Sequence, residues 1–171
     1  MWTPARSWLI AVKVLALVSC GRPVAAREAP FPAATNRVVL WSARSCYAEA
    51  AWSHDDCTAL MHVIRKRSAR SNWTYLRMLK AYSVKNWVQT QRGKTVLDLR
   101  LGSNIRRPSA WNQSWRLLVR HVWDVLDYRV EDPCPNADHW AAKYYQPKSP
   151  MRRVACDVET ENAFWVTSRR P

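Results

Sequence analysis

The sequence predicts a mainly α-helical domain with a small β component, an α+β fold that is stapled by disulfides. Several segments place apolar residues at helical spacing. The chain has only three glycines in 171 residues, too few for a turn-rich β-sandwich. Its apolar fraction of 48% is ample for a core, and its length fits one domain plus processing sequence.

The N-terminus resembles a secretory signal over residues 1–26. Arg6 supplies a positive start, an apolar run follows, and Val24-Ala25-Ala26 is a small-residue cleavage site. Leu17-Val18-Ser19-Cys20 also resembles a bacterial lipobox, in which Cys20 is lipidated and becomes the new N-terminus. A buried N-terminal helix is the remaining alternative. Either form of processing implies export to the periplasm, the medium or a lipid anchor, and membrane contact is expected only through that anchor.

The chain is strongly basic, with a formal charge of +14. Loss of residues 1–26 removes three cations and no acids, and so leaves +11. An exported basic protein is expected to meet anionic envelope polymers, although most of its cations are explained by a solvated surface. No nucleic-acid partner is expected, because export and disulfides argue against a nucleic-acid-binding protein.

Four cysteines remain after the leader: Cys46, Cys57, Cys134 and Cys156. An even number in an oxidising compartment predicts two disulfides. The local pairs Cys46–Cys57 and Cys134–Cys156 are favoured over the two other pairings. Zinc is the rival explanation, but the spacing lacks any C-x-x-C pair. No metal or cofactor is therefore expected.

The helical segments are separated by clear breaks. Residues 27–37 contain two prolines and are interpreted as a linker before a helix over 38–50. Ser53 is a good N-cap for a second helix that ends near Arg70. Asp55 and Asp56 fall in its first turn, where the helix dipole favours negative charge. Capping explains these two aspartates better than catalysis does.

The rest of the chain is less regular. Residues 73–84 and 108–128 have helical spacing, and the second segment carries Trp111, Trp115 and Trp123 on an apolar face typical of a core. Residues 88–99 contain a weak hairpin pattern. After Asp132-Pro133 the sequence predicts a loop-rich ending with one terminal strand near residues 162–166.

Glu49 is the candidate general acid. It is expected near the C-terminus of the first helix, among small and apolar neighbours. The helix dipole and desolvation both raise the pKa of a carboxyl there, which suits proton donation near neutral pH. The alternative is an ordinary exposed helix glutamate.

Two motifs resemble the cell-wall hydrolase family that includes spore-cortex lytic enzymes, a branch of the lysozyme-like lytic transglycosylases. Tyr47-Ala48-Glu49-Ala50 is similar to the family's catalytic Ala-Glu-Ala segment. The segment from Asp132-Pro133 to Ala137-Asp138-His139-Trp140 is similar to its Asp-Pro-Thr-Gly-Gly-Ala-x-His-aromatic segment, which lines the cleft. Asn162-Ala163-Phe164-Trp165 is similar to its closing strand.

The resemblance implies a lysozyme-like domain over residues 38–171 that cleaves peptidoglycan between N-acetylmuramic acid and N-acetylglucosamine. Glu49 is the expected single general acid and base of a lytic transglycosylase, and His139 is expected in the cleft. Four aromatic residues are candidate sugar-stacking surfaces: Trp52, Trp140, Tyr144 and Tyr145.

The chain also departs from the family pattern. Ala51 to Cys57 replace the family's Gly-Glu-Pro-x-Glu-Gly-Gln continuation, and Pro135 and Asn136 replace glycines. The missing second glutamate weakens a hydrolytic mechanism but leaves a single-carboxylate mechanism intact. The alternative function is a non-catalytic wall-binding or envelope structural protein with a decayed hydrolase fold.

Overall fold

The computed structural model describes residues 30–84, 110–147 and 150–167. The expected signal, Cys20 and the weak hairpin pattern of residues 88–99 lie outside these residues. The elements, in chain order, are α1 (Asn36–Ala50), α2 (His54–Ser71), α3 (Tyr75–Leu79), the π-helix η1 (Lys80–Val84), α6 (Ala110–Leu126), β1 (His139–Ala142), β2 (Met151–Arg153) and β3 (Asn162–Thr167). The predicted mainly α, α+β fold class is confirmed.

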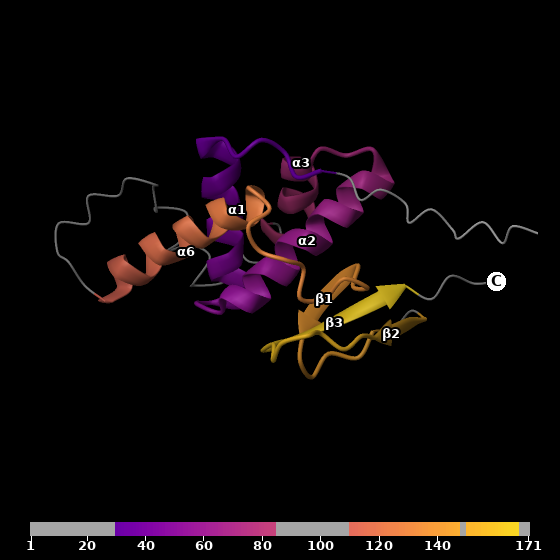
Figure 1. Cartoon of the computed structure of the whole chain (residues 1–171). Helices are drawn as coiled ribbons and strands as arrows, with labels where there is room; N and C mark the ends of the chain where they lie inside the picture. Colours follow the sequence, from indigo (N-terminus) through magenta and orange to yellow (C-terminus); the bar gives the residue numbers. More distant parts are fainter. Residues whose placement is uncertain (1–29, 85–109, 148–149, 168–171) are drawn as a thin grey trace, which may run out of the picture.

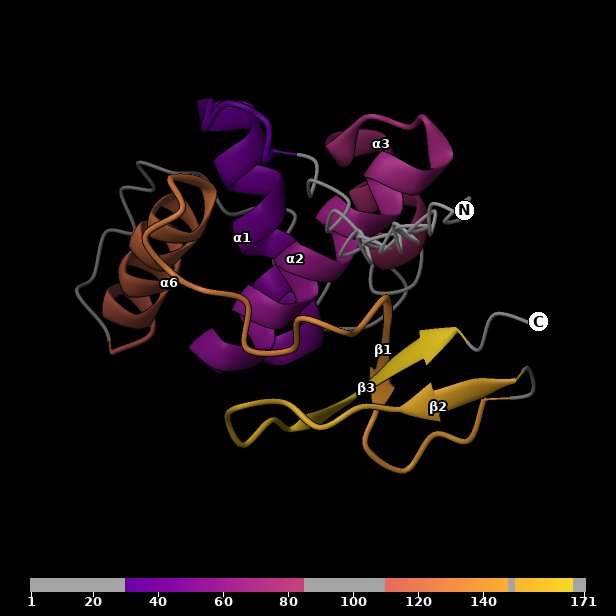
Figure 2. The same ribbon diagram turned by 45° about the vertical axis from the view of Figure 1, so that its right-hand side comes forward.

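The helices form one layer and the small sheet lies against one side of it (Figure 1). The sheet is antiparallel with β3 in the middle, in the order β1-β3-β2. Trp165 of β3 pairs with His139 on one side and with Arg153 on the other. In a second view the sheet again lies beside the helices, along α2 (Figure 2).

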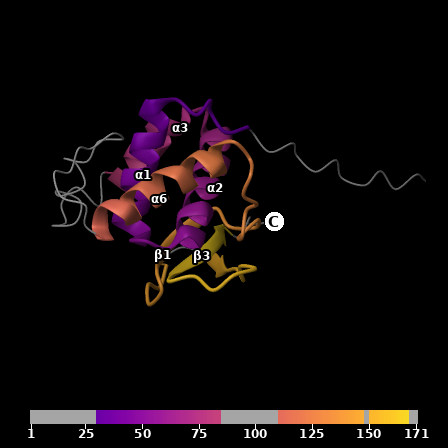
Figure 3. The same ribbon diagram turned by 60° about the vertical axis from the view of Figure 1, so that its left-hand side comes forward.

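α2 is the central element because its middle is buried on two faces. Leu60, Met61 and Ile64 pack in a core shared with α1 and α6. Ala59 and Val63 pack in a second cluster with Phe164 of β3. α6 crosses α1 and α2 in Figure 3, and Trp115 is fully buried as predicted. Trp123 packs against the same core, half-buried.

Three polar residues begin helices as N-caps. Thr35, Ser53 and Thr74 each accept a hydrogen bond from a backbone N–H three residues later. The Ser53 cap was predicted. α2 ends at Ser71, close to the predicted end near Arg70, and its C-cap Asn72 adopts the left-handed conformation (φ 54°). Over residues 73–84 the predicted single helix is instead a short α-helix that continues as a π-helix.

The expected linker does not remain outside the fold. α1 begins at Asn36, two residues before the predicted start. Phe31 is buried, and its ring contacts the rings of His62, Tyr75 and Tyr128. Its aromatic surface explains this packing, because burial of a phenyl ring outweighs the ordering of a few residues of chain.

Both predicted disulfides are present, Cys46–Cys57 and Cys134–Cys156. The first joins α1 to α2 across the break after Ala50. The second joins the loop before β1 to the loop between β2 and β3. Besides the strand predicted near residues 162–166, which is β3, the loop-rich ending contains two short strands, β1 and β2, that the sequence did not predict.

Candidate functional site

Glu49 is the next-to-last residue of α1, as expected, and its side chain is half-buried. The Ser83 hydroxyl donates to Glu49 Oε1 over 3.4 Å, and the Trp140 side chain also donates to this carboxylate. Burial raises the pKa of Glu49, and these two hydrogen bonds oppose the rise without cancelling it. The predicted direction of the shift is confirmed, with desolvation as its main cause.

The chain turns sharply behind Glu49. Ala51 has φ 51°, a region that costs a non-glycine residue free energy, and its N–H donates to Tyr47 O. The Asn162 side chain donates to the backbone oxygen of Glu49 over 3.2 Å and satisfies a carbonyl at the helix end. The Cys46–Cys57 disulfide and the start of β3 thus hold the turn that positions Glu49.

Asp56 supports the same turn from inside the protein. It is fully buried, and its two carboxylate oxygens accept hydrogen bonds from the backbone N–H groups of Glu161 and Asn162 over 2.8 and 2.9 Å. Ser53 donates to the same carboxylate over 2.8 Å. The prediction that capping, not catalysis, explains this aspartate agrees with these contacts.

Glu49 opens into a pocket of about 250 Å³ between the helices and the sheet. The pocket is lined by Glu49, Arg67, Tyr82, His139, Trp140 and Ala141. These residues come from α1, α2, η1 and β1, so only the folded chain brings them together. Glu49 is the only carboxylate among these lining residues.

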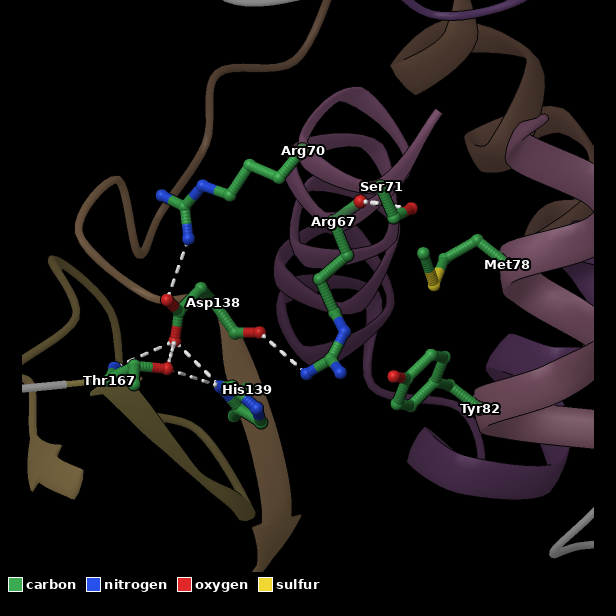
Figure 4. Close-up of a pocket in the computed structure, with 8 residues that line it drawn as sticks. All are labelled: Arg67, Arg70, Ser71, Met78, Tyr82, Asp138, His139 and Thr167. Atoms are coloured by element: carbon green, nitrogen blue, oxygen red, sulfur yellow. Dashed lines mark hydrogen bonds and ion pairs between the residues drawn. The ribbon is translucent and has the colours of Figure 1, made fainter. Parts of the chain in front are cut away.

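A second pocket, of about 220 Å³, is lined by Arg67, Arg70, Ser71, Met78, Tyr82, Asp138, His139 and Thr167 (Figure 4). It shares Arg67, Tyr82 and His139 with the Glu49 pocket. Because the two pockets share three walls, they form one groove. We call the first part the Glu49 pocket and the second part the Asp138 pocket.

Asp138 and His139 form a hydrogen-bonded pair at the junction. The distance from His139 Nδ1 to Asp138 Oδ1 is 2.6 Å, and Arg70 donates to Asp138 Oδ2 over 2.7 Å. Burial alone would raise the pKa of Asp138, but hydrogen bonds from His139, the Thr167 backbone and Arg70 outweigh it and lower the pKa. Since the ionised carboxylate only accepts, Nδ1 of His139 is the donor in this pair.

The loop that leads to this pair is held by a buried lysine. Lys66 Nζ lies 2.6 Å from Asp132 Oδ2, and it donates to the backbone oxygens of Cys134, Pro135 and Ala137 over 2.7 to 3.1 Å. Both charged side chains are at least nine-tenths buried. This contact explains how a loop with two prolines can place Asp138 and His139 accurately.

The structure brings together three of the predicted site residues, Glu49, His139 and Trp140. The other three do not line the groove. Trp52 packs its ring against Tyr47 at 4.5 Å, Tyr144 is 88% exposed, and Tyr145 is exposed on the turn after β1.

Sequence reasoning missed Arg67, Tyr82 and Asp138. Asp138 directly precedes His139 in the motif, and this position could have identified it as a site residue. Arg67 was hidden among the cations that end α2, and no pattern singled out Tyr82.

No family model matches this chain, and no curated protein or solved structure shows detectable similarity to it. No helix in the described part of the chain is long and apolar enough to cross a membrane. Within the same residues, no group of three or more His, Cys, Asp and Glu side chains is placed to hold a metal ion.

Proposed function

We propose that the protein is an exported enzyme that cleaves the bond between N-acetylmuramic acid and N-acetylglucosamine in peptidoglycan, with Glu49 as its single general acid and base. One observation carries the proposal: a half-buried carboxyl with a raised pKa opens into a groove lined by aromatic and cationic side chains. The motifs that resemble cell-wall hydrolases contain three residues of this groove, Glu49, His139 and Trp140.

The reaction needs one proton donor that later accepts a proton. Protonated Glu49 gives its proton to the glycosidic oxygen as the bond from that oxygen to C1 breaks, and C1 becomes oxocarbenium-like. The resulting carboxylate takes the proton of the sugar's own 6-hydroxyl as O6 bonds to C1. The product is a 1,6-anhydro sugar, and Glu49 ends protonated for the next cycle.

The groove favours this reaction over hydrolysis. A hydrolase needs a second carboxylate to activate water or to act as nucleophile. Asp138, in the neighbouring pocket, is held in hydrogen bonds from Arg70, His139 and Thr167. Those bonds stabilise its charge, and they make it a poor base.

Other residues of the Glu49 pocket suit a sugar. The Trp140 ring offers an apolar face for a pyranose, while its N–H contacts Glu49. His139 and Tyr82 also line this pocket. The two disulfides are compatible with an oxidising compartment outside the cytoplasm, and the signal over residues 1–26, with lipidation at Cys20 as its alternative, is the proposed route of export.

The test is mass spectrometry of purified peptidoglycan digested with the mature, oxidised protein, beside Glu49→Gln and Glu159→Gln. Glu159 is an exposed glutamate outside the groove and is the matched control. We expect anhydro-muropeptides from the parent and from the control, and none from Glu49→Gln. Reducing-end muropeptides would instead indicate hydrolysis. Binding to peptidoglycan without any released fragment would favour the non-catalytic wall-binding alternative.

A further inference from the structure

The Asp138 pocket contains more positive charge than negative charge. Arg67 and Arg70 lie three residues apart on one face of α2, near its C-terminal end, and both line the pocket. Asp138 is the only acid among the lining residues. Figure 4 shows both arginine side chains reaching from α2 toward β1.

Asp138 is paired with Arg70 and, among the described residues, no carboxylate is paired with Arg67. Its Oδ2 is paired with Arg70 at 2.7 Å, and its Oδ1 accepts from His139 and from the Thr167 backbone. Arg67 donates a hydrogen bond to the backbone oxygen of Asp138, over 3.2 Å, and it has no ion pair among the described residues. Within the part of the chain that the structure describes, a cation without an ion-pair partner therefore lies in the wall that the two pockets share.

The guanidinium of Arg67 is held in place, and most of its N–H donors make no hydrogen bond to the described residues. It lies 3.7 Å from the centre of the Tyr82 ring, which fixes its plane by cation–π contact. A guanidinium has five N–H donors, and among the described residues one hydrogen bond from this group is seen, to the backbone of Asp138. Its planar fork suits a carboxylate, which accepts two parallel hydrogen bonds.

We propose that Arg67 is the centre of a carboxylate-binding subsite that recognises an acidic group carried by the muramic acid residue of the substrate. This inference rests on the proposed function, because it places the bond to be cleaved in the adjoining Glu49 pocket. N-acetylmuramic acid differs from N-acetylglucosamine by its lactyl group, whose carboxyl is free in peptide-free strands and amide-linked to an acidic peptide in intact ones. The subsite thus selects peptidoglycan over uncharged amino-sugar polymers.

The test measures binding apart from cleavage. In the Glu49→Gln background, calorimetry compares soluble glycan oligomers that have free carboxylates with the same oligomers after amidation of those carboxylates. We expect at least about tenfold tighter binding of the free-carboxylate form, as a charge-assisted hydrogen-bond pair provides, and a smaller difference at high salt. Running peptide-free and peptide-bearing oligomers separately shows which carboxylate is the ligand.

Three substitutions locate the effect on Arg67. Arg67→Gln removes the preference, and Arg67→Lys retains part of it, because the charge stays while the fork is lost. Arg77→Gln is the matched control, since Arg77 also stacks on an aromatic ring, that of Trp73 at 4.3 Å, but lies outside the groove. It leaves the preference unchanged. Circular dichroism confirms that each variant is folded.

Two results overturn the subsite: equal affinity for the free and amidated oligomers, or a preference that survives in Arg67→Gln. Cleavage by the parent protein is scored separately. If the parent protein cleaves peptidoglycan but no carboxylate preference is found, the proposed function stands and the subsite is rejected. If the carboxylate preference is found but the parent protein does not cleave peptidoglycan, the subsite stands and the catalytic role of Glu49 is rejected.

Discussion

The Glu49 pocket and the Asp138 pocket share three walls, yet their carboxyl groups have opposite pKa shifts. The pKa of Glu49 is raised because burial outweighs two neutral donors, Trp140 and Ser83. The pKa of Asp138 is lowered because Arg70, His139 and a backbone N–H outweigh burial. The partners of each carboxyl decide its protonation, and two neighbouring groups of the same chemistry can therefore have different roles.

The largest expected difference between the two carboxyl groups is in the rate of cleavage. Glu49→Gln is expected to lower the initial rate on soluble glycan strands about 10³-fold, because it removes the general acid. Asp138→Asn is expected to lower the rate only about tenfold, through loss of the orientation of His139. Glu159→Gln serves as the control. Equal losses in both groove variants would show that the two carboxyl groups act together and would break the distinction.

The next largest effect is on stability. Lys66→Met removes the lysine cation that lies 2.6 Å from the buried Asp132 carboxylate and leaves His62, at 3.6 Å, beside it, so we expect a loss of about 3 kcal/mol in the free energy of unfolding. Urea denaturation measures it, and Lys143→Met, an exposed lysine on the turn after β1, is the control. A loss below about 1 kcal/mol would mean that the loop before β1 does not depend on Lys66.

The opposite pKa shifts predict opposite pH dependences of stability. The folded state holds the proton of Glu49 more tightly than the unfolded chain does, so this group makes the protein less stable as pH rises from the ordinary glutamate pKa to the raised one. Asp138 contributes stability above the ordinary aspartate pKa, and that contribution is lost as pH falls through its lowered value.

Urea unfolding at a series of pH values checks both signs. Relative to the parent, Glu49→Gln should gain stability as pH rises above about 4, where an ordinary glutamate ionises. Asp138→Asn should cost most near neutral pH and less as pH falls below about 4. A stability difference that is independent of pH in either variant would contradict the assigned shift.

The smallest expected effect comes from Trp140→Phe. This change keeps an apolar ring but removes the N–H that donates to Glu49, so the pKa of Glu49 rises further. The alkaline limb of the pH–rate profile should move to higher pH, with a maximal rate within about tenfold of the parent. Trp52→Phe, outside the groove, should leave the limb in place. If the alkaline limb of the pH–rate profile does not move in Trp140→Phe, the hydrogen bond from Trp140 does not control the pKa of Glu49 during the reaction.

Local features of the chain were readable from the sequence alone. The small spacing within each cysteine pair favoured the two disulfides that the structure has. Ser53 identified the start of α2, and the Ala-rich run around Glu49 identified the end of α1 and the direction of its pKa shift. All of these depend on residues close together in the chain, where helix capping and local desolvation act.

Only the tertiary structure decided the walls of the groove. β1 and β2 are three to four residues long, too short for a periodic pattern, and they exist because β3 lies between them. Lys66 and Asp132 are 66 positions apart, and Arg67 and Asp138 are 71. The sequence by itself determined helices α1 and α2, the disulfides and the position of Glu49. The partners of Glu49, Asp138 and Arg67 were decided by packing of α2 against the sheet, because hydrogen bonds and ion pairs between distant segments form only when the core brings those segments together.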